Sequence, residues 1–198
     1  MNAEEVKLLE AIRNRRSIRK FADRDVADDI LKDIIEDAMH APNAGNRRQQ
    51  RIIVSKNKEI NDRIGRIHHI LEMKYRKHEP LTYTYEDIIN EKAVSGFYNA
   101  PVVVMLFGPK NFVFSDQDAA ILIDHIYLTA YARGVAACMV GENCSEFDGV
   151  YGQYLMKKWN IPENYRPCGF ILLGYYDGDY KNVPHISNHE YAEVIYER

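Results

Sequence analysis

The sequence contains few cysteines, and none of them is paired in a CxxC arrangement. Cys138, Cys144 and Cys168 are the only three among 198 residues. An odd number at these spacings excludes a disulfide framework and the common zinc ribbons. We therefore expect free thiols in a reducing cytoplasm, with an active-site thiol as the alternative.

No hydrophobic run reaches the length of a membrane span. The most apolar stretch, residues 118–132, is interrupted by Asp124 and His125, so it predicts a buried helix instead. The first fourteen residues are charged and amphipathic and contain no apolar signal core. The sequence therefore predicts a cytoplasmic protein with no membrane partner.

Several motifs of known chemistry are absent. The sequence contains no GxGxxG, P-loop, GxSxG or HExxH. His68 and His69 are adjacent on an expected helix and point about 100° apart, which is poor for chelation. His185 and His189 lie in a segment with Pro184 that is expected to be a loop. We therefore expect no metal site.

The chain also lacks internal repeats, low-complexity tracts and Gly/Ser linkers, so residues 1–198 are expected to form a single domain. The net charge of -3 and the pI of about 6.2 argue against a nucleic-acid partner.

Hydrophobic periodicity predicts alternating helices and strands. Helices are expected over residues 3–14, 28–41, 57–78, a stretch ending near 99, 116–133 and 147–159, and strands over 50–56, 100–108, 135–141 and 168–176. This alternation predicts a three-layer α/β or α+β arrangement. In the 147–159 helix, the spacing places Phe147, Val150, Tyr151 and Tyr154 on one face.

Residues 116–133 are apolar almost all round, which requires burial at the centre of the molecule or against a partner. The tail, residues 189–198, also carries apolar positions after the last expected strand. These two features favour a homodimer, and a central core helix is the alternative.

Two basic stretches stand out in this slightly acidic chain: "RNRRSIRKF" over residues 13–21 and "APNAGNRRQQR" over residues 41–51. Guanidinium groups and a hydroxyl suit a phosphate monoester, and amide side chains suit a ring carbonyl or ring N–H. The candidate ligand residues are Arg15, Ser17, Arg19, Asn46, Arg47 and Arg48. The alternative is that the first stretch only caps the C-terminal end of the first helix.

Four stretches in this order resemble the flavin-dependent nitroreductase family: "RRSIRKF", "APNAGNRRQQRIIV", "ARGVAACMVG" and "NIPENYRPCGFILLGYYDGD". The resemblance covers most of the chain and varies most over residues 57–100. It implies an α+β, nitroreductase-like three-layer fold with a central mixed sheet flanked by helices. It also implies an intertwined homodimer with FMN at two sites, each built by both subunits.

The resemblance assigns cofactor-binding roles to the first basic stretch and to the loop of the second. Arg15, Arg16, Ser17 and Arg19 would bind the FMN phosphate and ring edge. Asn46 would contact the isoalloxazine from the other subunit.

Further roles follow from the same resemblance. Val140, Gly141 and Glu142 would bring a backbone N–H to flavin N5. Arg48, or Arg47, would stabilise negative charge near N1 and O2 of the reduced ring.

The chain departs from the family pattern at two places. Arg48, Gln49 and Gln50 stand where many members have Gln and then a Pro-Trp pair. Lys181 corresponds to a basic residue that helps to bind the phosphate, and His185 stands where Arg is common. A histidine there would make phosphate binding weaker and more pH-dependent.

The function implied is hydride transfer from NAD(P)H through flavin N5 to a nitroaromatic, quinone or similar small acceptor, by a ping-pong mechanism without a catalytic side chain. Residues 65–98 would cover the pocket, with Tyr75, Tyr83, Tyr85 and Phe97 either stacking on the acceptor or packing in the core.

Two alternative functions remain for the whole chain: a flavin-binding protein without reductase activity, and a basic binding module without cofactor.

Overall fold

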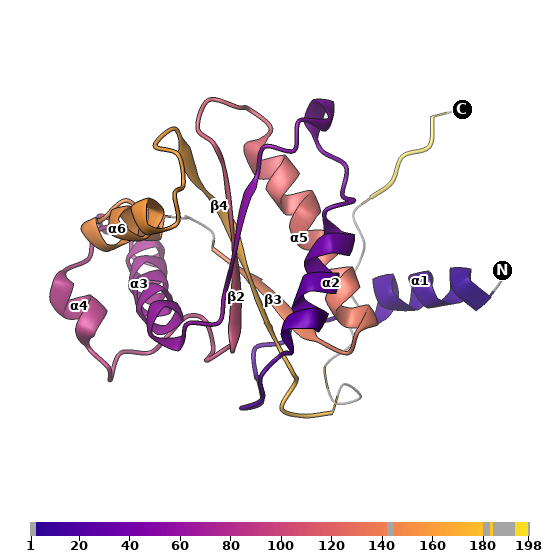
Figure 1. The fold of residues 1–198 in the computed structure, drawn as a ribbon, viewed down its shortest axis with the longest axis horizontal. Helices are drawn as coiled ribbons and strands as arrows, with labels where there is room; N and C mark the ends of the chain where they lie inside the picture. Colours follow the sequence, from indigo (N-terminus) through magenta and orange to yellow (C-terminus); the bar gives the residue numbers. More distant parts are fainter. Residues whose placement is uncertain (1–2, 142–144, 180–182, 184–192, 198) are drawn as a thin grey trace.

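The computed structural model describes residues 3–141, 145–179, 183 and 193–197. Helices and strands alternate along most of the chain (Figure 1). The elements are α1 (Ala3–Asn14), α2 (Asp28–Ala38), η1 (Ala44–Asn46), β1 (Arg51–Ser55), α3 (Lys58–Arg76), α4 (Tyr85–Ile89), β2 (Val102–Pro109), α5 (Ser115–Ala132), β3 (Ala136–Val140), η2 (Ser145–Phe147), α6 (Val150–Lys158) and β4 (Tyr165–Gly174).

The four strands form one sheet in the order β1-β2-β4-β3, and every neighbouring pair is antiparallel. The expected mixed sheet is therefore wrong for the described strands. The reason is that β4 lies between β2 and β3 and runs opposite to both. The single parallel pairing among the described residues is the isolated bridge between Ser17 and Ala137.

Helices cover both faces of this sheet, which confirms the predicted three layers (Figure 1). Side chains alternate between the faces along β2, as strand geometry requires. Val102 and Val104 pack with α2 and α5, whereas Val103 and Met105 pack with α3 and α6. The fully buried β2 therefore confirms the strand expected from its continuous apolar run.

α5 packs on the sheet and on α2, so most of its apolar side chains are buried within this one chain. Gly134 follows it with φ +70°, the left-handed conformation expected of a helix-terminating glycine. The central position of α5 agrees with the core-helix interpretation. Within the described residues, no helix has both the length and the hydropathy needed to cross a membrane.

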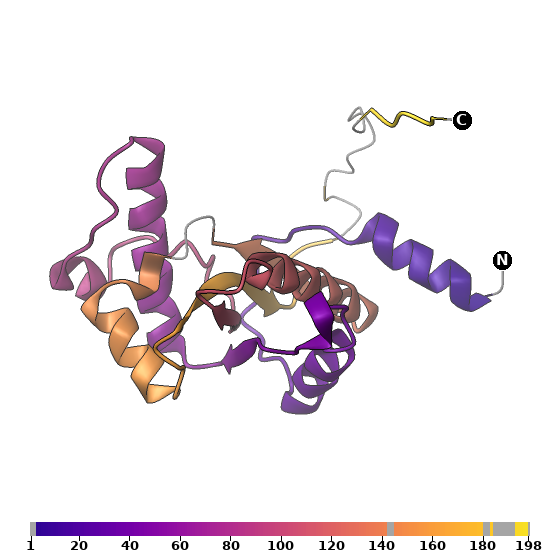
Figure 2. The same cartoon turned by 90° about the horizontal axis from the view of Figure 1, so that it is seen from above.

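α1 extends away from the rest of the chain, on the side where the C-terminal residues also lie (Figures 1 and 2). Its Leu8 and Ile12 side chains are 58% and 50% exposed. Val194, Ile195 and Tyr196 near the C-terminus are also exposed. Apolar side chains in both segments therefore lack contacts within one chain that would bury them.

Two expected elements differ from the structure. α4 ends at Ile89 and does not continue towards residue 99, because the backbone at Asn90 is extended. α6 buries Leu155 and Met156, whereas Val150 and Tyr154 are exposed.

The second difference has a local cause. The buried Phe147 belongs to η2, a separate turn that precedes α6, so it does not define the buried face of that helix.

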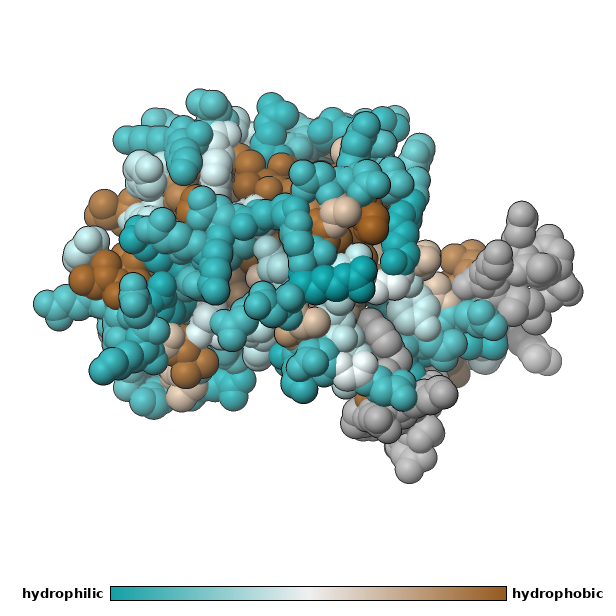
Figure 3. Space-filling view, turned by 60° about the horizontal axis from the view of Figure 1, so that its bottom comes forward, coloured by the Kyte–Doolittle hydropathy of each residue, from teal (hydrophilic) through white to brown (hydrophobic). Residues whose placement is uncertain are grey.

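The outer surface seen in Figure 3 is mostly hydrophilic, with hydrophobic residues in small separate patches.

Candidate functional site

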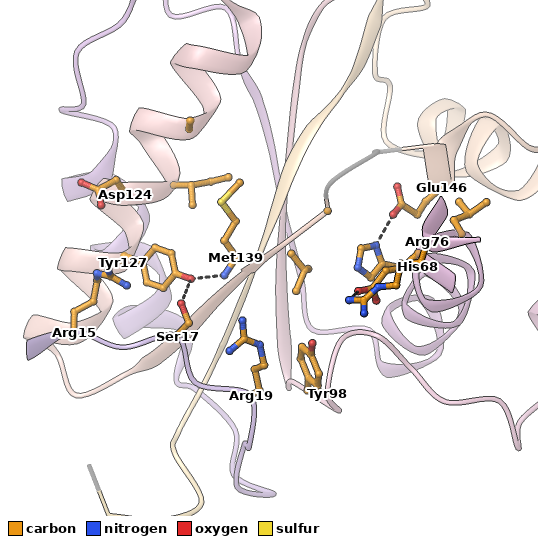
Figure 4. A pocket seen from close by; sticks show the side chains of 16 residues that line it. Arg15, Ser17, Arg19, His68, Arg76, Tyr98, Asp124, Tyr127, Met139 and Glu146 are labelled. Carbon is orange, nitrogen blue, oxygen red and sulfur yellow. Dashed lines mark hydrogen bonds and ion pairs between the residues drawn. The ribbon is translucent and has the colours of Figure 1, made fainter. Parts of the chain in front are cut away.

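A cavity of about 710 Å³ lies between the segment that follows α1, the helices α3 and α5, and the end of β3 (Figure 4). This volume is in the range of small-molecule sites. The lining residues are Arg15, Ser17, Arg19, His68, Leu71, Glu72, Arg76, Tyr98, Ala120, Ile123, Asp124, Tyr127, Met139, Val140, Gly141 and Glu146.

The first basic stretch forms the cationic wall. Ser17 makes a parallel bridge to Ala137, and the N–H of Ile18 donates to the Ala137 carbonyl at 2.9 Å. Ile18 is buried. Because side chains alternate along extended backbone, Arg15, Ser17 and Arg19 face the cavity. The structure thus brings the predicted Arg-x-Ser-x-Arg side chains together.

Tyr127 of α5 connects this wall to β3. Its hydroxyl oxygen accepts a hydrogen bond from the backbone N–H of Met139 and lies 3.1 Å from Ser17 Oγ. The guanidinium carbon of Arg15 lies 4.7 Å from the centre of the Tyr127 ring. The sequence motifs predicted no role for Tyr127. The available signal was a phenol on an otherwise apolar helix, since a buried tyrosine hydroxyl needs a partner.

The end of β3 supplies the adjoining wall, through Met139, Val140 and Gly141. Gly141 has φ +104°, and a Cβ there would lie 2.7 Å from the Phe170 ring. Only glycine fits this backbone without strain. The predicted Val140 and Gly141 therefore line the cavity, and Glu142 lies outside the described residues.

A buried histidine–carboxylate pair occupies the opposite wall (Figure 4). His68 Nδ1 lies 2.6 Å from Glu146 Oε1, and the two side chains are 10% and 1% exposed. The hydroxyl of Tyr83 donates to the Glu146 carbonyl at 3.0 Å. From the sequence, His68 was a candidate only for metal binding, and no motif pointed to Glu146. Their separation of 78 residues left no local signal.

The two described cysteines are free and have no sign of activation. Burial raises the pKa of the Cys138 thiol, and the positive charge of Arg19 opposes that rise only in part. Burial raises the pKa of Cys168 to about 11. Both thiols are therefore protonated near neutral pH, unlike catalytic cysteines. Cys144 lies outside the described residues.

Arg16, Asn46 and Arg48, the other predicted cofactor ligands in the described part of the chain, do not line this cavity. Arg16 donates to the carbonyls of Arg13 and Arg15 at 2.8 and 2.7 Å. Arg48 lines a different cavity, beside α2, and its Nε donates to Asn46 Oδ1 at 3.2 Å. Lys181 and His185 lie outside the described part of the chain, as Glu142 does.

The aromatic residues proposed as a pocket cover also lie elsewhere. Tyr75 and Tyr85 are 51% and 73% exposed, Phe97 is buried, and none of them lines the cavity. Tyr83 is held at the Glu146 carbonyl. Tyr98, the residue after Phe97, is the tyrosine of the 65–98 region that faces the cavity.

Comparisons with known proteins agree on one family. Residues 12–175 match the model of the nitroreductase family. The chain is 30% identical over 172 residues to a protein of Methanothermobacter thermautotrophicus named for NADH dehydrogenase/NAD(P)H nitroreductase activity, covering 85% of this chain and 76% of that protein.

Solved structures have the same fold. The structure of a nitroreductase with bound FMN from Bacteroides fragilis covers 100% of both chains at 22% identity, with a TM-score of 0.78. A nitroreductase with bound FMN from Desulfitobacterium hafniense, at 28% identity, covers 98% of this chain and 100% of its own, with a TM-score of 0.72. The sequence match over residues 12–175 and the shared fold lead to one conclusion: the chain belongs to the nitroreductase family.

Proposed function

We propose that this chain is an FMN-dependent oxidoreductase that passes a hydride from NAD(P)H to a nitroaromatic, quinone or similar small acceptor. The observation that carries the proposal is the convergence of Arg15, Ser17 and Arg19 on one side of a cavity. Apolar side chains and a required glycine form the adjoining wall. Family membership and FMN-bound relatives support the same assignment.

The cationic wall suits a phosphate monoester. Two guanidinium groups and a hydroxyl provide donors that match phosphate oxygens. The N–H of Met139 can only donate, so the Tyr127 oxygen accepts there and its own proton remains available to Ser17 Oγ. Ser17 can then direct its O–H towards an anion.

The rest of the cavity suits a flat heteroaromatic ring. Leu71, Ile123, Met139 and Val140 contribute apolar surface, and Gly141 allows close backbone approach at the end of β3. Bound flavin would supply the hydride chemistry. The chain's own residues would hold the phosphate, orient the ring and shape the acceptor site.

The same proposal includes a homodimer with sites built from both subunits. Asn46 and Arg48 do not line the cavity of their own chain. If they contact a flavin, it would be the flavin bound in the cavity of the other subunit. The exposed apolar residues of α1 and of the C-terminal segment offer surface for that copy to cover.

Steady-state kinetics test the proposal. Protein incubated with FMN should oxidise NADH or NADPH in the presence of duroquinone, a quinone whose ring carries no free position for thiol addition. Initial rates at varied concentrations of both substrates should give parallel double-reciprocal lines, because each substrate reacts in turn at one pocket. Intersecting lines would contradict the ping-pong mechanism. The absence of any NAD(P)H oxidation would contradict the reductase function.

A further inference from the structure

We propose that His68 donates a proton to an oxygen atom of the acceptor, and that Glu146 positions His68 for this step. The inference rests on the proposed function, because it concerns the second substrate of the same cavity. It changes one sequence-based expectation, that no side chain acts as an acid or base.

The imidazole of His68 is held in one orientation by three neighbours. Nδ1 is engaged by Glu146 at 2.6 Å. The ring lies 5.6 Å from the Phe97 ring, centre to centre. Cδ2 lies against Gly96, where an added Cβ would approach it to 2.7 Å. The ring therefore has little freedom to rotate.

This orientation leaves Nε2 for a ligand. His68 lines the cavity, and its hydrogen bond with Glu146 uses Nδ1. Nε2 is therefore the nitrogen of His68 that can meet a ligand in the cavity, on the wall opposite the cationic stretch (Figure 4).

Glu146 supplies the matching negative charge. Its side chain is 1% exposed, and Oε2 has no hydrogen-bond partner among the described residues. A buried carboxylate requires compensation by a nearby cation. The neighbouring Arg76 of α3 is engaged with Glu72 at 2.5 Å. His68 is the group in contact with Glu146, and because Nδ1 is bonded to this carboxylate, Nε2 is the nitrogen that can exchange a proton with a ligand.

The chemistry of the acceptor requires such a donor. A quinone that receives a hydride needs one more proton to become the hydroquinone. Nε2–H of His68 would supply that proton to the carbonyl oxygen, which forms the O–H bond as the N–H bond breaks. The imidazole would remain bonded to Glu146 through Nδ1–H and would regain its proton from solvent. A ring held by a carboxylate in this way is pre-oriented for general acid catalysis.

The test compares two acceptors that differ in their need for a proton. Duroquinone takes up a hydride and a proton, whereas ferricyanide takes up electrons alone. In His68→Gln we expect kcat/KM for duroquinone to fall about 100-fold, a typical loss for a general acid. Ferricyanide reduction should stay within about twofold, because it needs no general acid.

Two further variants sharpen this comparison. Glu146→Gln keeps an oxygen to accept from Nδ1 but removes the charge. It should lower duroquinone reduction about tenfold and leave ferricyanide reduction unchanged, as expected of a group that acts through the general acid. His69→Gln is the matched control, since His69 is the next residue of α3 and does not line the cavity. It should change neither reaction.

A second measurement needs no turnover. In oxidised protein labelled with 15N-histidine, adding duroquinone without NAD(P)H should shift the Nε2 resonance of His68 and leave that of His69 in place. His68→Gln serves to assign the resonance.

Equal losses with both acceptors in His68→Gln would show a structural role and overturn the inference, as would an unshifted Nε2 resonance at saturating duroquinone. If the wild type reduces both acceptors and His68→Gln reduces duroquinone as fast as the wild type does, this inference alone would be overturned. Wild-type protein that reduces neither acceptor would overturn the proposed function as well.

Discussion

Tyr127 links the two segments that bound the cationic part of the cavity. Its hydroxyl meets Ser17 in the segment after α1 and the backbone of Met139 in β3. Ser17 is predictable from a motif, because the ligand side chains there are close together in the chain. The motif does not reach Tyr127, which is 110 residues from Ser17. The His68–Glu146 pair escaped prediction for the same reason.

Replacing Arg19 with Ala should weaken FMN binding at least tenfold. Arg19 lines the cavity beside Ser17, and a hydrogen bond to a charged group contributes about 1.5–3 kcal/mol. Fluorescence titration of the protein with FMN measures the change. Lys20→Ala is the control, because Lys20 pairs with Asp177 at 2.9 Å and does not line this cavity. Unchanged affinity in Arg19→Ala would remove Arg19 from the phosphate site.

Replacing Tyr127 with Phe should lower the free energy of unfolding by about 1 kcal/mol, the net contribution of a typical hydrogen bond. The bond lost is the partly buried one that the Met139 N–H donates to the Tyr127 hydroxyl. Urea unfolding measures the loss. Tyr154→Phe should change stability little, because Tyr154 is 56% exposed. Equal stability of Tyr127→Phe and the wild type would show that the Met139 N–H has another partner.

At the scale of elements, β3 positions the site because glycines flank it on both sides. Gly134 lets the chain leave α5, and Gly141 lets it leave the strand against Phe170. Apolar alternation was sufficient to predict the strands, since burial of both faces of the sheet leaves a strong pattern. The buried face of α6 could not be predicted in this way, because Phe147 belongs to the preceding turn η2 and does not follow the periodicity of the helix.

Gly141→Ala should destabilise the fold more than Gly134→Ala. Both positions have positive φ, but a Cβ at 134 meets no atom within 4 Å, whereas a Cβ at 141 meets Phe170 at 2.7 Å. Gly141→Ala should lower the free energy of unfolding by about 1–2 kcal/mol from backbone strain alone. Denaturant unfolding of the two variants gives the comparison. A smaller loss for Gly141→Ala would mean that Phe170 moves aside freely.

At the scale of the whole molecule, one chain leaves apolar side chains of α1 and of the C-terminal segment exposed. The sequence predicted three layers, because helices and strands alternate along the chain. It did not predict the strand order that makes every neighbouring pair antiparallel. Strand order depends on contacts between distant segments, and local patterns do not encode them.

The double variant Leu8→Glu/Ile12→Glu should be monomeric, because it places charges on the exposed apolar face of α1. We expect the dimer dissociation constant to rise at least 100-fold, about 2.7 kcal/mol, and FMN affinity to fall with it. Sedimentation velocity checks the mass. Val150→Glu, at a position 90% exposed on α6, is the control and should behave as wild type. A wild-type monomer that binds FMN tightly would contradict the two-subunit site.

The visible absorption spectrum of the purified protein tests the central claim most directly. It should be recorded with FMN bound, in the absence of oxygen, before and after addition of NADH and of NADPH. We expect flavin bands that bleach with at least one nucleotide, because the flavin accepts its hydride. Bands that persist with both nucleotides would identify a flavin-binding protein without reductase activity. Failure to take up FMN at all would contradict the assignment of Arg15, Ser17 and Arg19 to a phosphate site.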